Sequence, residues 1–339
     1  MNPALHQQLD TARLELHDLA DAVHHAPARA ELAAAIARRD AVLWSRAAGV
    51  PIDVAALAML EADGTASHEG TPTVAGSPGG DIAIRYLDAL EIGRNDPDAH
   101  LPGVELLHRM LTCLTASNRD DAGFATVVHA TLAAVGAERP PGSAPGASIV
   151  QAATAYRRLA PPGQSVAEFT ALARLASALI LRPLDARPDD LALAPQLGSA
   201  AGEMDTRGVD DAAANDEPDR WLASFARSVS ATVQRTRELV ARLSALEDAD
   251  RVRIDVLGKA APSSHRVHRA LQRWPIASIA RTMDATGLQV QAATSALHRL
   301  RGLGIIREIT HRHRHRLYSY DGYVAIIAAD VDSWDRPRN

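Results

Sequence analysis

The stretch from about His265 to Asp330 restricts the possible folds of this 339-residue chain more than any other. Apolar residues at helical spacing, followed by two extended runs, predict three short helices and a β-hairpin: 267–273, 275–283 and 289–301, then strands at 305–309 and 317–320. Gly287 supplies the turn before the third helix, and Gly302 and Gly304 end it, because glycine adopts the left-handed conformation of a helix stop. The pattern is typical of a winged helix-turn-helix, here predicted over 265–332, whose last helix usually meets nucleic acid.

The outward side of the third predicted helix carries polar residues suited to reading DNA. These candidate DNA-binding residues are Gln289, Gln291, Thr294, Ser295, His298 and Arg299. A glutamine can pair with adenine through two hydrogen bonds, and small hydroxyl side chains suit close contact with phosphates or bases. The alternative is an ordinary solvated helix face.

The loop between the two predicted strands alternates histidine and arginine from His311 to Arg316. In an extended segment alternate residues share a face, so the arginines point to one side and the histidines to the other. The candidates for contact with phosphates or the minor groove are Arg312, His313, Arg314 and Arg316. Imidazoles two residues apart in a loop chelate zinc weakly, so no metal site is expected.

Charge is distributed unevenly along the chain. From Arg251 to the end there are 15 Lys and Arg against 7 Asp and Glu, a net charge of +8, and the remainder has 21 against 34, which gives −13. A basic segment attached to an acidic body is expected if only one end meets phosphates. The alternative is a chance imbalance between two domains of a compact protein.

The rest of the chain predicts a mainly α protein. We expect a helical body over 1–181, a linker over 182–218 that is rich in Pro, Asp, Ala and Gly, and a long helix over 219–257. Residues 4–24 carry a heptad-like apolar seam, which fits either a homodimer contact through the N-terminal helices or docking on the chain's own core.

Cysteine usage and hydropathy limit the class of protein further. Cys113 is the one cysteine, which excludes an internal disulfide framework and a Cys-rich zinc site. There is no charged-then-apolar leader and no apolar run long enough to span a bilayer, so we expect a cytoplasmic protein without a membrane partner.

The C-terminal half resembles the Fic family, specifically the members with a winged helix after the catalytic core. Three stretches carry the resemblance: Asp219–Phe225 at the start of a long helix, Ala296–Ile309 at the helix-to-wing junction, and Arg314–Asp321 in the second wing strand. The chain is also similar to rhizobial-type proteins with a degenerate Fic-like body and a C-terminal helix-turn-helix. Fic enzymes transfer AMP from ATP to a protein hydroxyl, which requires a histidine base and a Gly-Asn-Gly-Arg loop that binds phosphates.

That catalytic motif is missing from this sequence. By position its nearest counterpart is 182–190, where Arg182 stands in place of the base and no glycine exposes the backbone. We therefore expect a non-enzymatic transcriptional regulator without a cofactor, which binds double-stranded DNA through the basic C-terminal module. Two alternatives stay open: a diverged AMP-transferring enzyme, and an interaction protein whose winged helix packs on its own body and touches no nucleic acid.

Overall fold

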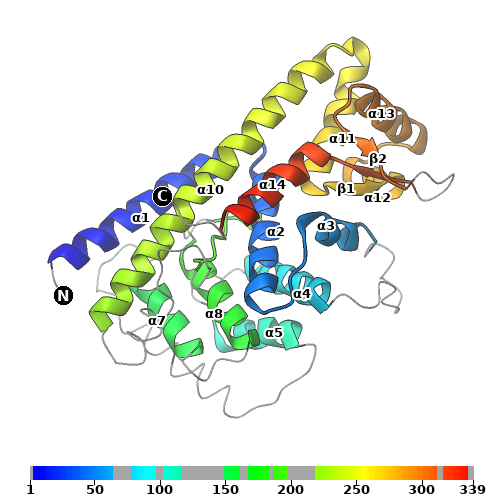
Figure 1. Cartoon of the computed structure of the whole chain (residues 1–339). Coiled ribbons are helices and arrows are strands. Elements are labelled where there is room, and N and C mark those ends of the chain that lie inside the picture. The colour runs from blue at the N-terminus through cyan, green and yellow to red at the C-terminus, as the bar shows by residue number, and fades with distance from the viewer. Residues whose placement is uncertain are drawn as a thin grey trace.

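The computed structural model describes residues 3–63, 78–96, 102–115, 131, 149–160, 167–182, 186–196, 218–310 and 316–334. The fold is mainly helical with a small three-stranded antiparallel sheet, as the sequence predicts at the level of class. A helical body lies at one end, a C-terminal module at the other, and the long helix α10 (Pro218–Asp255) runs along both (Figure 1).

The body is built from helices close to those the sequence predicts. They are α1 (Pro3–His24), α2 (Arg29–Ala47), α3 (Val54–Asp63), α4 (Pro78–Arg94), α5 (Val104–Thr115), α7 (Ile149–Leu159) and α8 (Ala167–Ile180). Helix α4 begins at Pro78. Its first turn contains Gly79, where a side chain would overlap with the carbonyl oxygen of Val50, so only glycine lets the two backbones approach.

Helix α1 docks on the chain's own core. Its heptad-like seam is buried, mainly against α10 and also against α2 and α7: Leu5, Leu9, Ala12, Leu16, Leu19 and Val23. The docking interpretation of this pattern is therefore the one that the structure supports. A homodimer contact through the N-terminal helices would have to use another face of α1.

The linker predicted over 182–218 is wrong for residues 191–196. Their side chains, Leu191 to Gln196, are all buried in an extended segment of the core. The segment is fixed by its polar end, because the Gln196 amide N–H donates to Thr232 Oγ1 at 3.2 Å and its side chain donates to Asp40 Oδ1 at 3.2 Å. A run of alternating Leu and Ala resembles low-complexity sequence, but here these apolar side chains pack into the core.

The C-terminal module begins earlier than predicted. A short 3₁₀ turn, η2 (Gly258–Ala260), leads into α11 (Ala261–Arg273), whereas the sequence predicted the module from 265 and its first helix from 267. The next elements are β1 (Ile276–Ser278), α12 (Ile279–Thr286), α13 (Val290–Gly302), β2 (Arg307–Glu308), β3 (Leu317–Ser319) and α14 (Asp321–Ser333). The helix predicted over 275–283 is wrong for its first residues, which form β1.

Strand β1 exists because it has a partner far away in the chain. The sheet order is β1-β3-β2, with Ile276 opposite Ser319 on one side and Arg307 opposite Ser319 on the other. The amide of Tyr320 also donates to the carbonyl oxygen of Pro275 at 2.8 Å. Ser278 then caps α12, since its side chain accepts a hydrogen bond from the Arg281 amide at 3.1 Å.

Buried polar groups join α10 to the module. The hydroxyl of Tyr320, which follows β3, donates to Asp250 Oδ2 of α10 at 2.6 Å and lies 3.0 Å from Nε2 of His268 in α11. Arg253 pairs with the other oxygen of Asp250 at 2.9 Å and donates to the carbonyl oxygen of Leu303 at the end of α13. Burial raises the pKa of the Asp250 carboxyl, but hydrogen bonds from His268, Tyr320 and Arg253 outweigh burial and hold it below its ordinary value.

A second contact fixes the module to the body. Trp274 lies between two guanidinium groups, that of Arg281 at 4.3 Å and that of Arg38 at 5.8 Å from its ring centroid. Arg38 of α2 also forms an ion pair with Glu61 of α3 at 2.6 Å, and it donates to the carbonyl oxygen of Arg273. The sheet packs beside this site on α3, so the body holds the module in one orientation.

Candidate nucleic-acid interface

The turn before α13 sets the direction of that helix. Gly287 ends α12 with a positive φ of 65°, the conformation that the sequence predicts for this glycine. Thr286 holds the turn from both sides, because its Oγ1 accepts from the Leu288 amide at 3.3 Å and its carbonyl oxygen accepts from Arg266 of α11. One side of α13 is buried on α11 and α12: Ala293, Ala296, Leu297 and Leu300.

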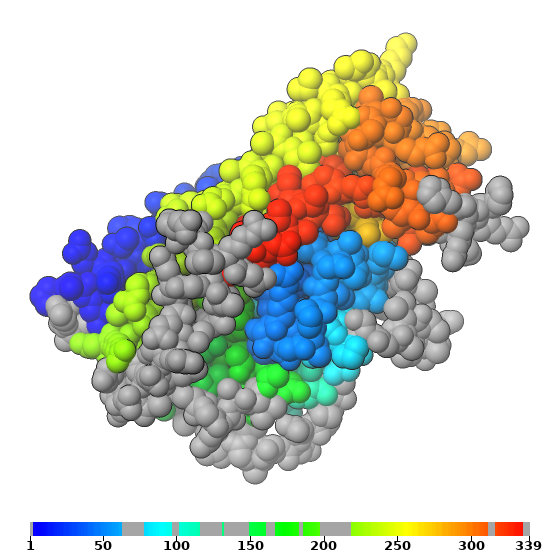
Figure 2. Space-filling model, in the orientation of Figure 1, coloured from blue at the N-terminus to red at the C-terminus, as the bar shows by residue number. Residues whose placement is uncertain are grey.

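The opposite side of α13 is open. Gln291, Ser295 and His298 are exposed and follow one another at spacings of four and three, which places them on one stripe. Their side chains make no hydrogen bond or ion pair within the described residues. Helix α13 also lies at the outer edge of the molecule, away from the body helices α4, α5, α7 and α8 (Figure 1; the orange region of Figure 2).

The other predicted residues of α13 differ in exposure. Gln289 precedes the helix and is exposed, whereas Thr294 and Arg299 are half-buried. Arg299 lies 3.5 Å from the hydroxyl of Ser263, so its guanidinium is directed back toward α11. Val290 is 53% exposed at the start of the helix, where an apolar side chain can contact a thymine methyl group. The open face is thus centred on Gln291 and Ser295.

The structure describes part of the predicted wing. Arg312, His313 and Arg314 lie outside the described residues. Arg316 is half-buried and forms an ion pair with Glu308 Oε1 at 3.5 Å, and Arg301 pairs with Oε2 of the same carboxylate at 3.0 Å. The buried Glu308 therefore brings two arginines together at the base of the wing.

The module is strongly basic. Residues 258–320 contain 11 Lys and Arg against Asp284 and Glu308, a net charge of +9. Because Glu308 is buried between two arginines, Asp284 is the one exposed acidic side chain in the described part of this range. A polyanion that approaches α13 therefore meets a positive field from its own side of the molecule.

Sequence reasoning missed the basic stripe of α11. Arg266, Arg269 and Arg273 are exposed at spacings of three and four. Arg266 contacts the turn that leads into α13, where phosphates flank a helix inserted into a groove. The spacing of these arginines in the sequence is sufficient to predict that they share one face of a helix. The prediction was missed because the helix was expected to begin at Val267 instead of Ala261.

The described residues of the segment 182–190, compared above with the Fic catalytic loop, have a structural role. Arg182 is buried and donates to the carbonyl oxygen of Arg187. Burial lowers the pKa of its guanidinium, against the opposing effect of Asp190, but arginine stays charged and cannot act as a base. Asp190 accepts from the Arg187 amide at 2.7 Å and pairs with His24 Nδ1 at 3.1 Å, which fastens the segment to α1.

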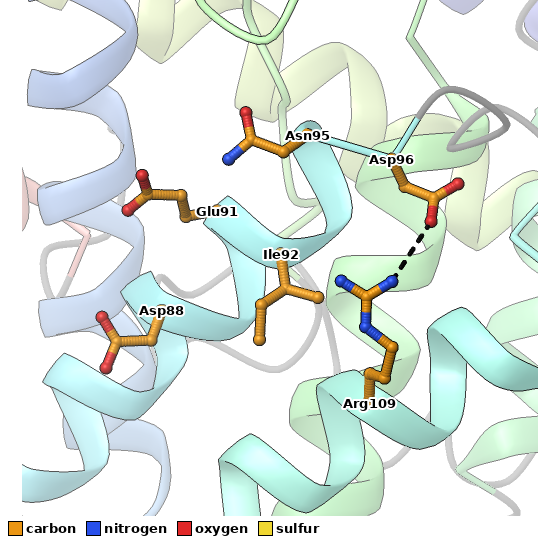
Figure 3. A pocket seen from close by; sticks show the side chains of 6 residues that line it. All are labelled: Asp88, Glu91, Ile92, Asn95, Asp96 and Arg109. Carbon is orange, nitrogen blue, oxygen red and sulfur yellow. Dashed lines mark ion pairs between the residues drawn. The ribbon is translucent and has the colours of Figure 1, made fainter.

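A surface pocket of about 450 Å³ between α4 and α5 is acidic (Figure 3). Its polar lining includes Asp88, Glu91 and Asp96, and Arg109 pairs with Asp96 at 3.6 Å. Burial raises the pKa of Asp88, and the charge of Glu91 adds to the effect. Negative charge of this kind repels phosphate groups, so the pocket is unsuited to nucleic acid. Within the described ranges, no group of three or more His, Cys, Asp or Glu could hold a metal ion.

Comparison with known proteins gives no family. No protein-family model matches the chain, and no curated protein is similar to it. Among the described helices, none combines the length and apolarity that crossing a bilayer requires. The functional argument therefore depends on the exposure, charge and geometry of the C-terminal module.

Proposed function

We propose that the C-terminal module is a winged helix-turn-helix, and that the protein is a non-enzymatic transcriptional regulator that binds duplex DNA. The observation that carries the proposal is the open face of α13: Gln291, Ser295 and His298 are exposed and unpaired within the described residues of a module of net charge +9. The element order also supports it, because three helices followed by a β-ribbon make up the usual winged module.

Helix α13 has the dimensions and side chains for the major groove. An α-helix with its side chains is about 10–12 Å across and the major groove is about 12 Å wide. Gln291 has the two-pronged amide that pairs with adenine, and Ser295, one turn further on, has a hydroxyl that suits bases or phosphates. Val290 adds an apolar contact at the leading end of the helix.

Phosphate contacts supply most of the affinity in this proposal. Arg266 contacts the turn before α13, and the sequence between the two strands of the hairpin supplies further arginines: Arg312, Arg314 and Arg316. Each phosphate that is neutralised releases a counterion, so binding weakens as salt rises.

The body is proposed as a non-catalytic, Fic-like platform. The roles of Arg182 and Asp190 in fixing the chain to α1 support this over AMP transfer, since neither is available as a base. Incubation with labelled ATP and a cell lysate tests it: we expect no transfer of label, and labelled protein in the lysate would restore the enzyme alternative.

The interaction alternative, in which the module serves only to pack on the body, has weaker support. The module contacts the body through α11, β1 and α14, and these contacts leave the outer face of α13 uncovered by any described element. A surface kept polar, exposed and positively surrounded suits a polyanion better than the apolar core of a protein interface.

The proposal is tested by adding one negative charge to the open face. Gln291→Glu loses a base contact worth about 1–3 kcal/mol and adds repulsion from phosphates, so affinity for duplex DNA should fall at least about tenfold. The matched control is Gln8→Glu, the same exchange on an exposed position of α1 in the body, which should bind like the wild type. Fluorescence polarisation with a pool of random duplexes measures both at several salt concentrations.

Two results would overturn the proposal. One is wild-type protein that does not bind duplex DNA at 50 mM salt, where electrostatic contacts are strong. The other is equal affinity of the two glutamate variants, which would place the DNA contact elsewhere. Circular dichroism melting of both variants keeps the comparison free of folding effects, because both positions are exposed.

A further inference from the structure

The distal half of α10 and the turn that follows it present an uncovered stripe of small apolar residues, with Val256 directly after the last helical residue, Asp255. Ala245, Ala249, Val252 and Val256 follow one another at spacings of four, three and four, and all are exposed. Val256 is 83% exposed and Val252 is 67% exposed, the two highest values for large hydrophobic side chains among the described residues. Isolated exposed apolar residues are ordinary, but three on one stripe of a helix, continued by a fourth in the next turn, are not.

No described element lies over this stripe. Helix α1 accompanies the first half of α10, with Asp18 lying 3.9 Å from Arg237, and ends at His24. The opposite side of α10 is the one occupied by the chain itself, because Leu243, Asp250 and Ile254 are buried. The distal end of α10 projects beyond α1 in Figure 1 and is uncovered in the view of Figure 2.

We propose that a second copy of this chain covers the stripe, with the two α10 helices side by side and parallel. The spacing is that of a heptad repeat in which Ala249 and Val256 take the a positions and Ala245 and Val252 take the d positions. Alanine lets two helix backbones approach closely, and valine at the distal turn fills the wider space.

The flanking charges select the parallel orientation. In this register Asp248 is at a g position and Arg253 at an e position five residues later, the pair that faces across a parallel coiled coil. Both side chains are partly exposed, at 64% and 45%, and each also has a partner in its own chain: Asp248 pairs with Arg251 at 2.7 Å and Arg253 with Asp250 at 2.9 Å, so a pair across the dimer shares these charges. In an antiparallel pair, g positions face g positions, so the acidic flank formed by Asp248 and Asp255 would meet its own copy.

A parallel pair has a consequence for the module. It places the two modules at the same end of the dimer and relates them by a twofold axis, as binding to a palindromic site requires. The seam spans only about 17 Å of helix, so the free dimer is expected to be weak and to gain from simultaneous contact with two half-sites. This consequence rests on the proposed function, whereas the pairing itself does not.

Cysteine cross-linking tests the pairing in full-length protein without DNA. The background is Cys113→Ser, which removes a half-buried thiol whose pKa burial raises to about 11. Val252→Cys and Val256→Cys are each oxidised at high protein concentration. Both should give covalent dimers, because in a parallel pair every seam residue meets its own copy. Arg251→Cys is the control, exposed on the same turn but off the stripe.

The outcomes separate the pairing from DNA binding. Cross-linking at both seam positions well above the Arg251→Cys level supports the proposal, even if the protein binds no DNA. Cross-linking at one position alone indicates an antiparallel pair, and cross-linking at neither removes the dimer; both results overturn it. Sedimentation of a Val252→Arg, Val256→Arg variant adds a second measurement, with Leu14→Arg on α1, where the side chain is 56% exposed, as an exposed apolar control. Only the stripe variant should lose the dimer, at least about tenfold in association constant.

Discussion

Replacement of Tyr320 by phenylalanine removes one hydroxyl group from the joint between α10 and the module. That hydroxyl donates to Asp250 Oδ2 at 2.6 Å and lies 3.0 Å from His268 Nε2. All three side chains are at most 3% exposed, so water cannot replace the lost partner without entering the core. The change leaves the shape of the ring intact and tests the hydrogen bond itself.

The expected cost follows from the charge of the partner. A hydrogen bond to an ionised group contributes about 1.5–3 kcal/mol, and a buried carboxylate that loses a donor keeps its desolvation penalty. Asp250 retains Arg253 at 2.9 Å, which limits the loss. We therefore expect Tyr320→Phe to lower the free energy of unfolding by about 2 kcal/mol, and the thermal midpoint by about 3 °C for a chain of this length.

The chain offers a matched control two residues earlier. The hydroxyl of Tyr318 is also buried, but no described group hydrogen-bonds to it. Tyr318→Phe removes a hydroxyl that gains nothing from the fold, so it should change stability by less than about 0.5 kcal/mol or increase it. Urea unfolding followed by circular dichroism measures both variants. Equal destabilisation of the two, or a neutral Tyr320→Phe, would refute the reasoning.

Three further predictions concern the same module. The pKa of Asp250 is lower in the folded than in the unfolded state, so its contribution to the free energy of unfolding is complete above about pH 4 and is lost as the pH falls further. Acid titrations of the wild type and Asp250→Asn should therefore show that the wild type loses more stability below about pH 4. Gly287→Ala forces a side chain into positive φ and should cost about 1 kcal/mol by urea unfolding, while Gly302→Ala, with open space around it, should cost nothing. Replacing Arg312 and Arg314 together by alanine should flatten the salt dependence of DNA binding by up to about two units of slope without lowering the melting midpoint. Arg316 is left in place because it pairs with the buried Glu308. An unchanged slope would exclude these two arginines from the contact.

Local pattern was sufficient for most helices of this protein. The seam of α1, the length of α10 and the apolar side of α13 all follow from residues three and four apart, whose spacing depends on the helix itself. For the same reason the exposure of Gln291 and Ser295 was predictable, since they lie opposite Leu297 and Leu300 on the helix. The DNA-binding function and the Fic resemblance stay predictions.

The errors lie where distant partners decide the structure. Residues 276–278 have helical spacing in the sequence, but pairing with residues 317–319 makes them a strand. Leu191 and Leu193 lie in a composition typical of linkers, yet α10 and α2 provide the core that buries them. A single sequence carries no information about which segment will be the partner, so pairing and core insertion of this kind cannot be read from it.

The unbroken length of α10 gives the protein mechanical leverage. Its 38 residues form a rod of about 57 Å. One end of the rod packs against the body and the other against the module. A tilt of about 5° at the body moves the far tip of such a rod by about 5 Å, more than the 3.4 Å step between stacked bases. Because the module also packs on α2 and α3, such a tilt requires these contacts to shift with it, and under the proposed function it would displace α13 by more than one base step.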